Sequence, residues 1–144
     1  MSVVARNELE EDLPPALSRD YSAVAASVPR ARCALVAAAR SAGADDDQLE
    51  AVRLAVSEAL TNAVIHAYPK SAGRIHVLAW TGEGEFVVEI ADDGPGLQAH
   101  TDTPGLGMGL GLISQVTDDF TIRQPHSGGT AVRMRFWLRP QADA

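Results

Sequence analysis

The stretch from residue 45 to residue 67 constrains the fold of this chain most, because its pattern predicts one long helix with two different faces. Aspartates at 45–47 suit the positive end of a helix dipole, and Tyr68-Pro69 would end the helix. Glu58, Asn62 and His66 lie four residues apart and share one face, which is either solvated or functional. The opposite side has the spacing of a face that packs against a sheet: Leu49, Val52, Val56, Ala59, Leu60 and Ala63.

Two glycine motifs beside predicted strands favour the functional interpretation. Asp92-Asp-Gly94-Pro-Gly96 follows a strand, where a buried carboxylate could accept a hydrogen bond from an amino group such as that of adenine. Gly94 and Gly96 would let the backbone lie close to the base. Gly128-Gly129-Thr130 precedes the last predicted strand, from which Thr130 could support Asp92 directly or through a water. Alone, each motif is also compatible with an ordinary turn.

A third glycine motif, Gly107-Met108-Gly109-Leu110-Gly111, precedes a predicted helix over residues 110–117. Free amides at a helix N-terminus suit a triphosphate, although a flexible loop has the same composition. On the long helix, Asn62 offers a neutral oxygen to Mg²⁺. Glu58 could take a proton from a water or hydroxyl that attacks the γ-phosphate, whereas His66 is most simply structural.

The order of the predicted elements indicates a two-layer α/β sandwich of the α+β class. These elements are a strand within 17–26, helices over 27–41 and 45–67, strands over 75–80 and 86–90, a loop over 92–106, a helix over 110–117, and strands over 120–123 and 130–138. Because the strands pair as hairpins, we expect a mostly antiparallel sheet covered on one face by helices, with its other face exposed to water. We expect residues 1–16 to be a flexible arm, 17–138 the domain and 139–144 a tail.

Composition excludes several classes of partner. The net charge is -7 and the chain has no cluster of Lys or Arg, which argues against binding to nucleic acid or to an anionic membrane. No apolar run is long enough for a membrane span, and the N-terminus is acidic. The single cysteine, Cys33, lies in an Ala/Leu/Val-rich predicted helix and is expected to be a buried, reduced thiol. We therefore expect a soluble, cytoplasmic protein.

Taken together, the motifs resemble the N, G1, G2 and G3 boxes of the GHKL ATPases, which share the Bergerat fold. The matching residues are Glu58-x-x-x-Asn62, Asp92-x-Gly94-x-Gly96, Gly107-x-Gly109-Leu110 and Gly129-Thr130. More narrowly, the stretches 56–68 and 107–113 are similar to bacterial anti-sigma factor serine kinases of the RsbW and SpoIIAB type. The resemblance covers residues 17–138.

The resemblance implies a division of labour for ATP and Mg²⁺. Asp92 would bind the adenine amino group, with Gly94, Gly96 and Thr130 around the base. Asn62 would hold Mg²⁺, and Glu58 would be the catalytic base that activates a serine or threonine of a partner. The amides that would bind the phosphates belong to Gly107, Met108, Gly109 and Leu110.

The resemblance also implies partners. The substrate would be a STAS-domain anti-anti-sigma factor, which competes with a sigma factor for the kinase, and the kinase would be a homodimer. Arg32, on the first predicted helix, matches a position near partner-binding surfaces in relatives.

Two other functions remain open. The loop over residues 97–106 is short and contains no Lys or Arg to meet the γ-phosphate, so the chain could be a non-catalytic, ATP-binding module that sequesters a regulator. The carboxylate at Glu58 favours the kinase instead. A self-contained hydrolytic ATPase is the least favoured, because the chain lacks a transducer domain.

Overall fold

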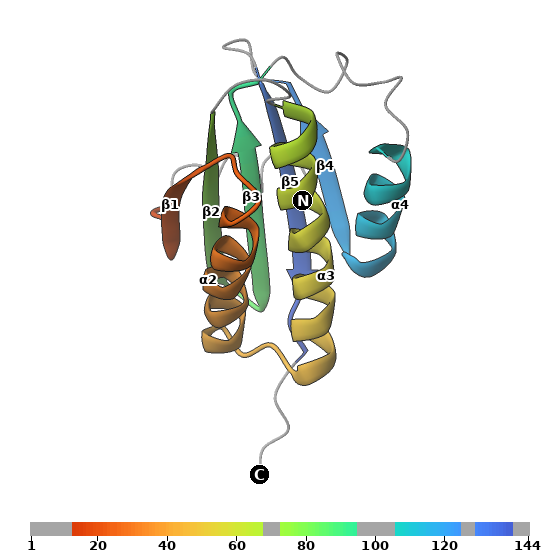
Figure 1. The fold of residues 1–144 in the computed structure, drawn as a ribbon. Coiled ribbons are helices and arrows are strands. Elements are labelled where there is room, and N and C mark those ends of the chain that lie inside the picture. Colours follow the sequence, from red (N-terminus) through yellow and green to blue (C-terminus); the bar gives the residue numbers. More distant parts are fainter. Residues whose placement is uncertain (1–12, 68–72, 95–105, 125–128, 140–144) are drawn as a thin grey trace.

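The computed structural model describes residues 13–67, 73–94, 106–124 and 129–139, apart from the side chains of 66, 67 and 106–110. Five antiparallel strands form one sheet in the order β1-β2-β3-β5-β4. Three helices cover one face of it (Figure 1). The elements are β1 Leu17–Ser22, α2 Ser27–Ser41, α3 Asp46–Asn62, the π-helical turn η1 Ala63–Ala67, β2 Arg74–Gly82, β3 Glu85–Asp92, α4 Leu106–Val116, β4 Asp119–Arg123 and β5 Thr130–Trp137. The predicted α+β sandwich is therefore confirmed.

Helix α3 confirms the long helix predicted from the sequence, and its apolar side is the centre of the core. All six residues predicted for that side are buried. At its N-terminus the Asp45 carboxylate accepts from the Gln48 amide (2.8 Å), while the Gln48 side-chain oxygen accepts from the Asp45 amide (3.0 Å). This capping box satisfies two amides that the helix itself leaves unpaired. The predicted last turn is a π-helical turn, η1, a type of turn that is frequent at functional sites.

Helix α2 has the predicted bounds, but the prediction that Cys33 is buried was wrong. Its buried side is formed by Ala31, Leu35, Val36 and Ala39. Cys33 lies two residues from both Ala31 and Leu35, so it falls on the opposite side of the helix and is exposed. None of the described helices is long and apolar enough to cross a membrane.

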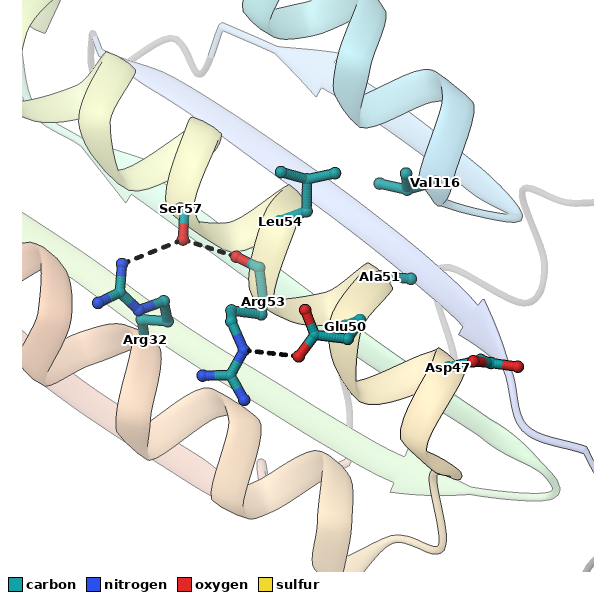
Figure 2. A pocket seen from close by; sticks show the side chains of 8 residues that line it. All are labelled: Arg32, Asp47, Glu50, Ala51, Arg53, Leu54, Ser57 and Val116. Carbon is teal, nitrogen blue, oxygen red and sulfur yellow. Dashed lines mark hydrogen bonds and ion pairs between the residues drawn. The ribbon is translucent and has the colours of Figure 1, made fainter.

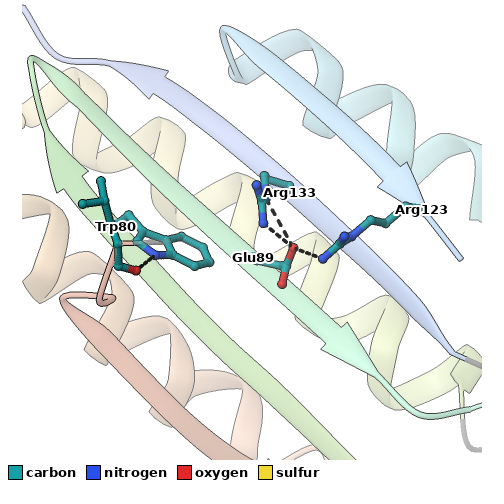
Figure 3. A network of polar contacts seen from close by, with 5 residues as sticks. Trp80, Glu89, Arg123 and Arg133 are labelled. Carbon is teal, nitrogen blue, oxygen red and sulfur yellow. Dashed lines mark hydrogen bonds and ion pairs between the residues drawn. The ribbon is translucent and has the colours of Figure 1, made fainter. Parts of the chain in front are cut away.

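The sheet face opposite the helices is less exposed than predicted. On β5 the alternation is as expected, with Met134 and Phe136 in the core. However, Arg133 and Arg135 on the other face are buried as well. The Glu89 carboxylate accepts from Arg133 (3.0 Å) and from Arg123 (3.2 Å), as Figure 3 shows. Strong ion pairs between neighbouring strands let these charges leave water, which alternation alone does not reveal.

An aromatic side chain completes this network. The Trp80 ring lies 5.2 Å from the Arg133 guanidinium carbon, a cation–π contact. Its indole N–H donates to the Leu13 carbonyl oxygen (3.1 Å), which holds the start of the described chain against β2 (Figure 3). Farther along the same face, Arg135 donates to Glu85 (2.8 Å). The middle of this face is therefore an ion-paired layer and not a wet surface.

The start of β5 lies against the end of β3 at Gly129. The backbone of Gly129 has a φ of +86°, a conformation that favours glycine. A Cβ at this position would overlap the Asp92 carbonyl oxygen and lie 2.9 Å from its carbonyl carbon. Both the backbone angle and the close contact therefore require glycine here.

We expect Gly129→Ala to lower the free energy of unfolding by about 2–5 kcal/mol, the sum of left-handed backbone strain and overpacking. The matched control is Gly84→Ala, because Gly84 has a φ of +78° with open space around it. This control bears the backbone strain alone and should lose about 1–2 kcal/mol. Urea unfolding of the two variants measures the difference, and equal losses would contradict the close contact.

We expect Glu89→Gln to lower the free energy of unfolding by about 3 kcal/mol, because it leaves the Arg133 guanidinium buried beside a neutral group. Only 8% of the Glu89 side chain is exposed. The control is Glu83→Gln in the exposed β2–β3 turn, which should change stability by less than about 0.5 kcal/mol. A loss at Glu89 as small as at Glu83 would mean that the ion pairs on this face contribute no net stability.

Candidate functional site

Groups far apart in the sequence meet at one end of the sandwich (Figure 1). Strands β3 and β5 are antiparallel, so Asp92 at the end of β3 lies directly opposite Thr130 at the start of β5. Helix α3 runs toward the same end, where η1 contacts β3. Helix α4 begins at this end (Figure 1). The structure thus brings together the predicted residues from α3, β3 and β5 and the start of α4.

The Asp92 side chain is directed toward the helices. It belongs to the same strand face as Val88 and Ile90, which are part of the core. Asp92 is only 9% exposed, as is Thr130 beside it. One carboxylate oxygen, Oδ1, accepts from the Gly94 amide at 2.9 Å, which closes a tight turn after β3. A buried carboxylate at the edge of the core can accept a hydrogen bond from an amino group of a ligand.

Asn62 is the last residue of α3, immediately before η1. Its side-chain nitrogen, Nδ2, is buried and has no hydrogen-bond partner within the part of the chain that the structure describes. An unpaired buried amide costs about 1–3 kcal/mol, which a polar ligand can offset. Glu58 lies one turn earlier on the same side of the helix and is partly exposed. This pair fits an Mg²⁺-nucleotide, with Asn62 for the metal and phosphate and Glu58 accessible to a substrate.

The glycine motif 107–111 lies within α4, because this helix begins at Leu106 and not at Leu110 as predicted. Glycine disfavours helix by about 1 kcal/mol per residue, which is why the sequence predicted a loop. Packing overrides that preference: α4 contacts α3, and its Ile113 is fully buried. Gly107, Met108, Gly109 and Leu110 therefore belong to the first turns of a helix, whose leading amides have no intrahelical acceptor. Gly96 lies outside the described residues.

Arg32 lines a groove of about 450 Å³ between α2, α3 and α4 (Figure 2). Its guanidinium donates to the Ser57 hydroxyl at 3.3 Å, and that hydroxyl donates to the Arg53 carbonyl oxygen at 2.6 Å. Leu54, 40% exposed, and Val116 form an apolar part of the groove. The structure thus places Arg32 on a helical surface, bonded to the residue that directly precedes Glu58 in α3.

Sequence reasoning missed one group next to Asp92. The His76 imidazole lies between two carboxylates, with Nδ1 at 2.7 Å from Asp20 and Nε2 at 2.9 Å from Asp93. The hydrogen bond to Asp93, and next that to Asp20, raises the pKa of His76, while burial opposes the rise. No spacing in the sequence signals this group, because its members come from β1, β2 and the turn after β3.

This chain is similar to several known proteins. Residues 21–136 match the family model described as histidine kinase-like ATPase domain. An anti-sigma F factor of Clostridium botulinum is 34% identical over 62% of this chain and 71% of its own length. The serine-protein kinase RsbW of Bacillus mycoides is 29% identical over 75% of this chain and 76% of its own.

A solved structure has the same fold. It contains the RsbU and RsbW domains of a Mycobacterium tuberculosis protein and superposes with a TM-score of 0.68 at 26% identity. The match covers 89% of this chain and spans about a third (34%) of that longer one. The family model matches most of this chain, residues 21–136. The chain therefore belongs to the histidine kinase-like ATPase domain family, the GHKL group that its motifs resemble.

Proposed function

We propose that this protein is an anti-sigma factor with serine/threonine kinase activity. It binds Mg-ATP, phosphorylates a STAS-domain anti-anti-sigma factor and sequesters a sigma factor in the cytoplasm. The observation that carries this proposal is the buried Asp92 beside Thr130, at the same end of the fold as the Asn62 amide, which has no partner among the described residues. Similarity to proteins named anti-sigma F factor and serine-protein kinase RsbW supports the choice of partners.

Different residues at this end bind different parts of the nucleotide. Asp92 accepts a hydrogen bond from the adenine amino group, and Gly94, Gly96 and Thr130 line the base. The leading amides of α4, at Leu106, Gly107 and Met108, donate to the phosphates. Gly109 and Leu110 follow them, and their amides bond within the helix. Asn62 holds Mg²⁺ through its amide oxygen, and its Nδ2 donates to a phosphate oxygen. When bound, ATP would supply the phosphoryl group and Mg²⁺ would offset negative charge on its oxygens.

Glu58 acts as the general base. It lies one helical turn before Asn62, so the group that holds Mg²⁺ and the group that takes the proton are positioned by one rigid helix. Its partial exposure leaves it accessible to the hydroxyl of a serine or threonine on a partner protein. Glu58 would accept the proton of that hydroxyl as the hydroxyl oxygen bonds to the γ-phosphorus, while the bond from this phosphorus to the β–γ bridging oxygen breaks and ADP leaves.

The groove around Arg32 is the surface that we propose for partner proteins. It combines apolar area at Leu54 and Val116 with Arg32, with Asp47 and with the ion pair of Arg53 and Glu50 (3.2 Å). The proposal includes a homodimer, as the family resemblance implies.

A second function, the non-catalytic module that sequesters a regulator, is favoured by one observation. Residues 97–106 contain no Lys or Arg that could meet the γ-phosphate. In that case ATP is a conformational ligand, and sequestration proceeds without transfer of phosphate.

We expect Asp92→Asn to weaken ATP binding by about 10- to 100-fold, because a hydrogen bond to a charged acceptor contributes about 1.5–3 kcal/mol. Asparagine keeps an oxygen for the Gly94 amide, so the fold should persist. The control is Asp119→Asn on the exposed side of β4, which should bind ATP like the parent. Calorimetric titration with Mg-ATP measures the ATP affinity of both variants. Equal affinities of the two variants would mean that Asp92 does not bind the adenine.

We expect Glu58→Gln to lower phosphotransfer at least about 100-fold while partner binding is retained, since it removes only the proton acceptor. The substrate is the STAS-domain protein that the tagged protein captures from its native cells in the presence of Mg-ATP. Mass spectrometry then identifies the residue that is phosphorylated. Glu83→Gln is the control that should stay active. Full activity of Glu58→Gln would overturn the assignment of the base, and a parent protein that binds partners without phosphorylating them would favour the sequestering module.

A further inference from the structure

We propose that His76 is a positioning residue for the nucleotide site, and that it holds the turn after β3 fully only when both of its ring nitrogens are protonated. The inference rests on the proposed nucleotide site at Asp92. It assigns a role to a side chain that lies on the sheet face opposite that site and touches neither the base nor the phosphates.

The geometry links three neighbouring segments of the chain. His76 on β2 lies directly opposite Asp20 on β1, and their side chains are 2.7 Å apart. Its other nitrogen is 2.9 Å from the carboxylate of Asp93, the residue after the end of β3. The residue opposite His76 on β3 is the small Ala91, which leaves room on this face for the ring between the two carboxylates.

Counting donors sets the protonation state. A neutral imidazole has one N–H, whereas both aspartates, when ionised, can only accept. The two hydrogen bonds therefore coexist only on an imidazolium ring, and loss of its proton sacrifices one of them. In agreement, the pKa of His76 is raised by Asp93 first and Asp20 second, against desolvation. The other charged groups that the described strands place on this face are Arg74 on β2, Glu85 and Glu89 on β3, Arg133 and Arg135 on β5, and Asp119 and Arg123 on β4. Glu89 is engaged by Arg133 and Arg123, and Glu85 by Arg135.

The turn transmits this contact to the site. Successive residues of a strand point to opposite faces, so Asp92 is directed to the helices while Asp93 reaches His76 on the other face. Gly129, directly before β5, lies against the backbone of Asp92 and Asp93. Gly129 therefore limits the turn on one side and the His76–Asp93 bond ties it on the other. Both contacts favour the backbone conformation in which the Asp92 carboxylate is directed to the nucleotide site.

The sign of the pH effect follows from the raised pKa of His76. The stabilisation of the turn is complete below the ordinary pKa of histidine, about 6.5, and is lost as the pH rises through the higher pKa of the folded protein. ATP binding and protonation of His76 favour the same turn, so each strengthens the other. The side chains of Asp20 and Asp93 are 52% and 70% exposed, so salt will weaken the effect.

The test is the dissociation constant for Mg-ATP between pH 5.5 and 8.5, for the parent, His76→Gln and Asp93→Asn. Because the nucleotide itself titrates in this range, the quantity to compare at each pH is the dissociation constant of the variant divided by that of the parent. We expect both variants to bind about three- to tenfold more weakly than the parent at low pH, with the ratio falling toward one at high pH. The control is Asp20→Asn, which keeps the bond to Asp93 and should only move the transition to lower pH.

A second readout separates this inference from the proposed function. Titration of the His76 ring by NMR should show a lower pKa in Asp93→Asn even without nucleotide, and a higher pKa in the parent when ATP is added. A parent that binds ATP with ratios constant across the pH range overturns the positioning role and leaves the nucleotide site intact. A parent that binds no ATP at any pH, with the His76 pKa still raised, overturns both.

Discussion

The antiparallel pairing of β3 with β5 is the interaction on which the candidate site depends. Its register places Asp92 opposite Thr130, and the backbone of Gly129 fits against Asp92 only because this residue has no side chain. A pair of central strands is among the most rigid parts of a small domain, so the carboxylate and the hydroxyl are oriented before any ligand arrives. The helices contribute the groups with more freedom, from the end of α3 and the start of α4.

The two faces of the sheet use different chemistry. The inner face is apolar and packs on α2 and α3, whereas the outer face holds Glu89 between Arg133 and Arg123 and His76 between Asp20 and Asp93. The two faces meet at the turn after β3, where Asp92 belongs to one and Asp93 to the other. Charge on the outer face can therefore influence the buried site through a single peptide unit.

Much of the architecture could be predicted from local pattern. The 3.6-residue periodicity of α3 identified all six of its predicted core residues, and the hairpins indicated an antiparallel sheet. The errors at Arg133 and Gly107 share one cause, since they concern properties that neighbours in space decide. Arg133 was expected to be wet because alternation does not show its partner Glu89, and Gly107 was expected in a loop because glycine propensity does not show that α4 packs on α3. The division into arm, domain and tail, and the roles of Glu58 and Asn62, stay predictions.

The sequence by itself determined the helix with Glu58 and Asn62, the three glycine motifs and the family to which the chain belongs, because these depend on residues close in the chain and on their order. Only the tertiary structure decided that Gly129 fits against Asp92, that the Asn62 amide lacks a partner among the described residues, and that His76 joins Asp20 to Asp93. Asp20 and Asp93 lie 56 and 17 residues from His76. Strand register and packing set the distances between such residues, and no local pattern records them.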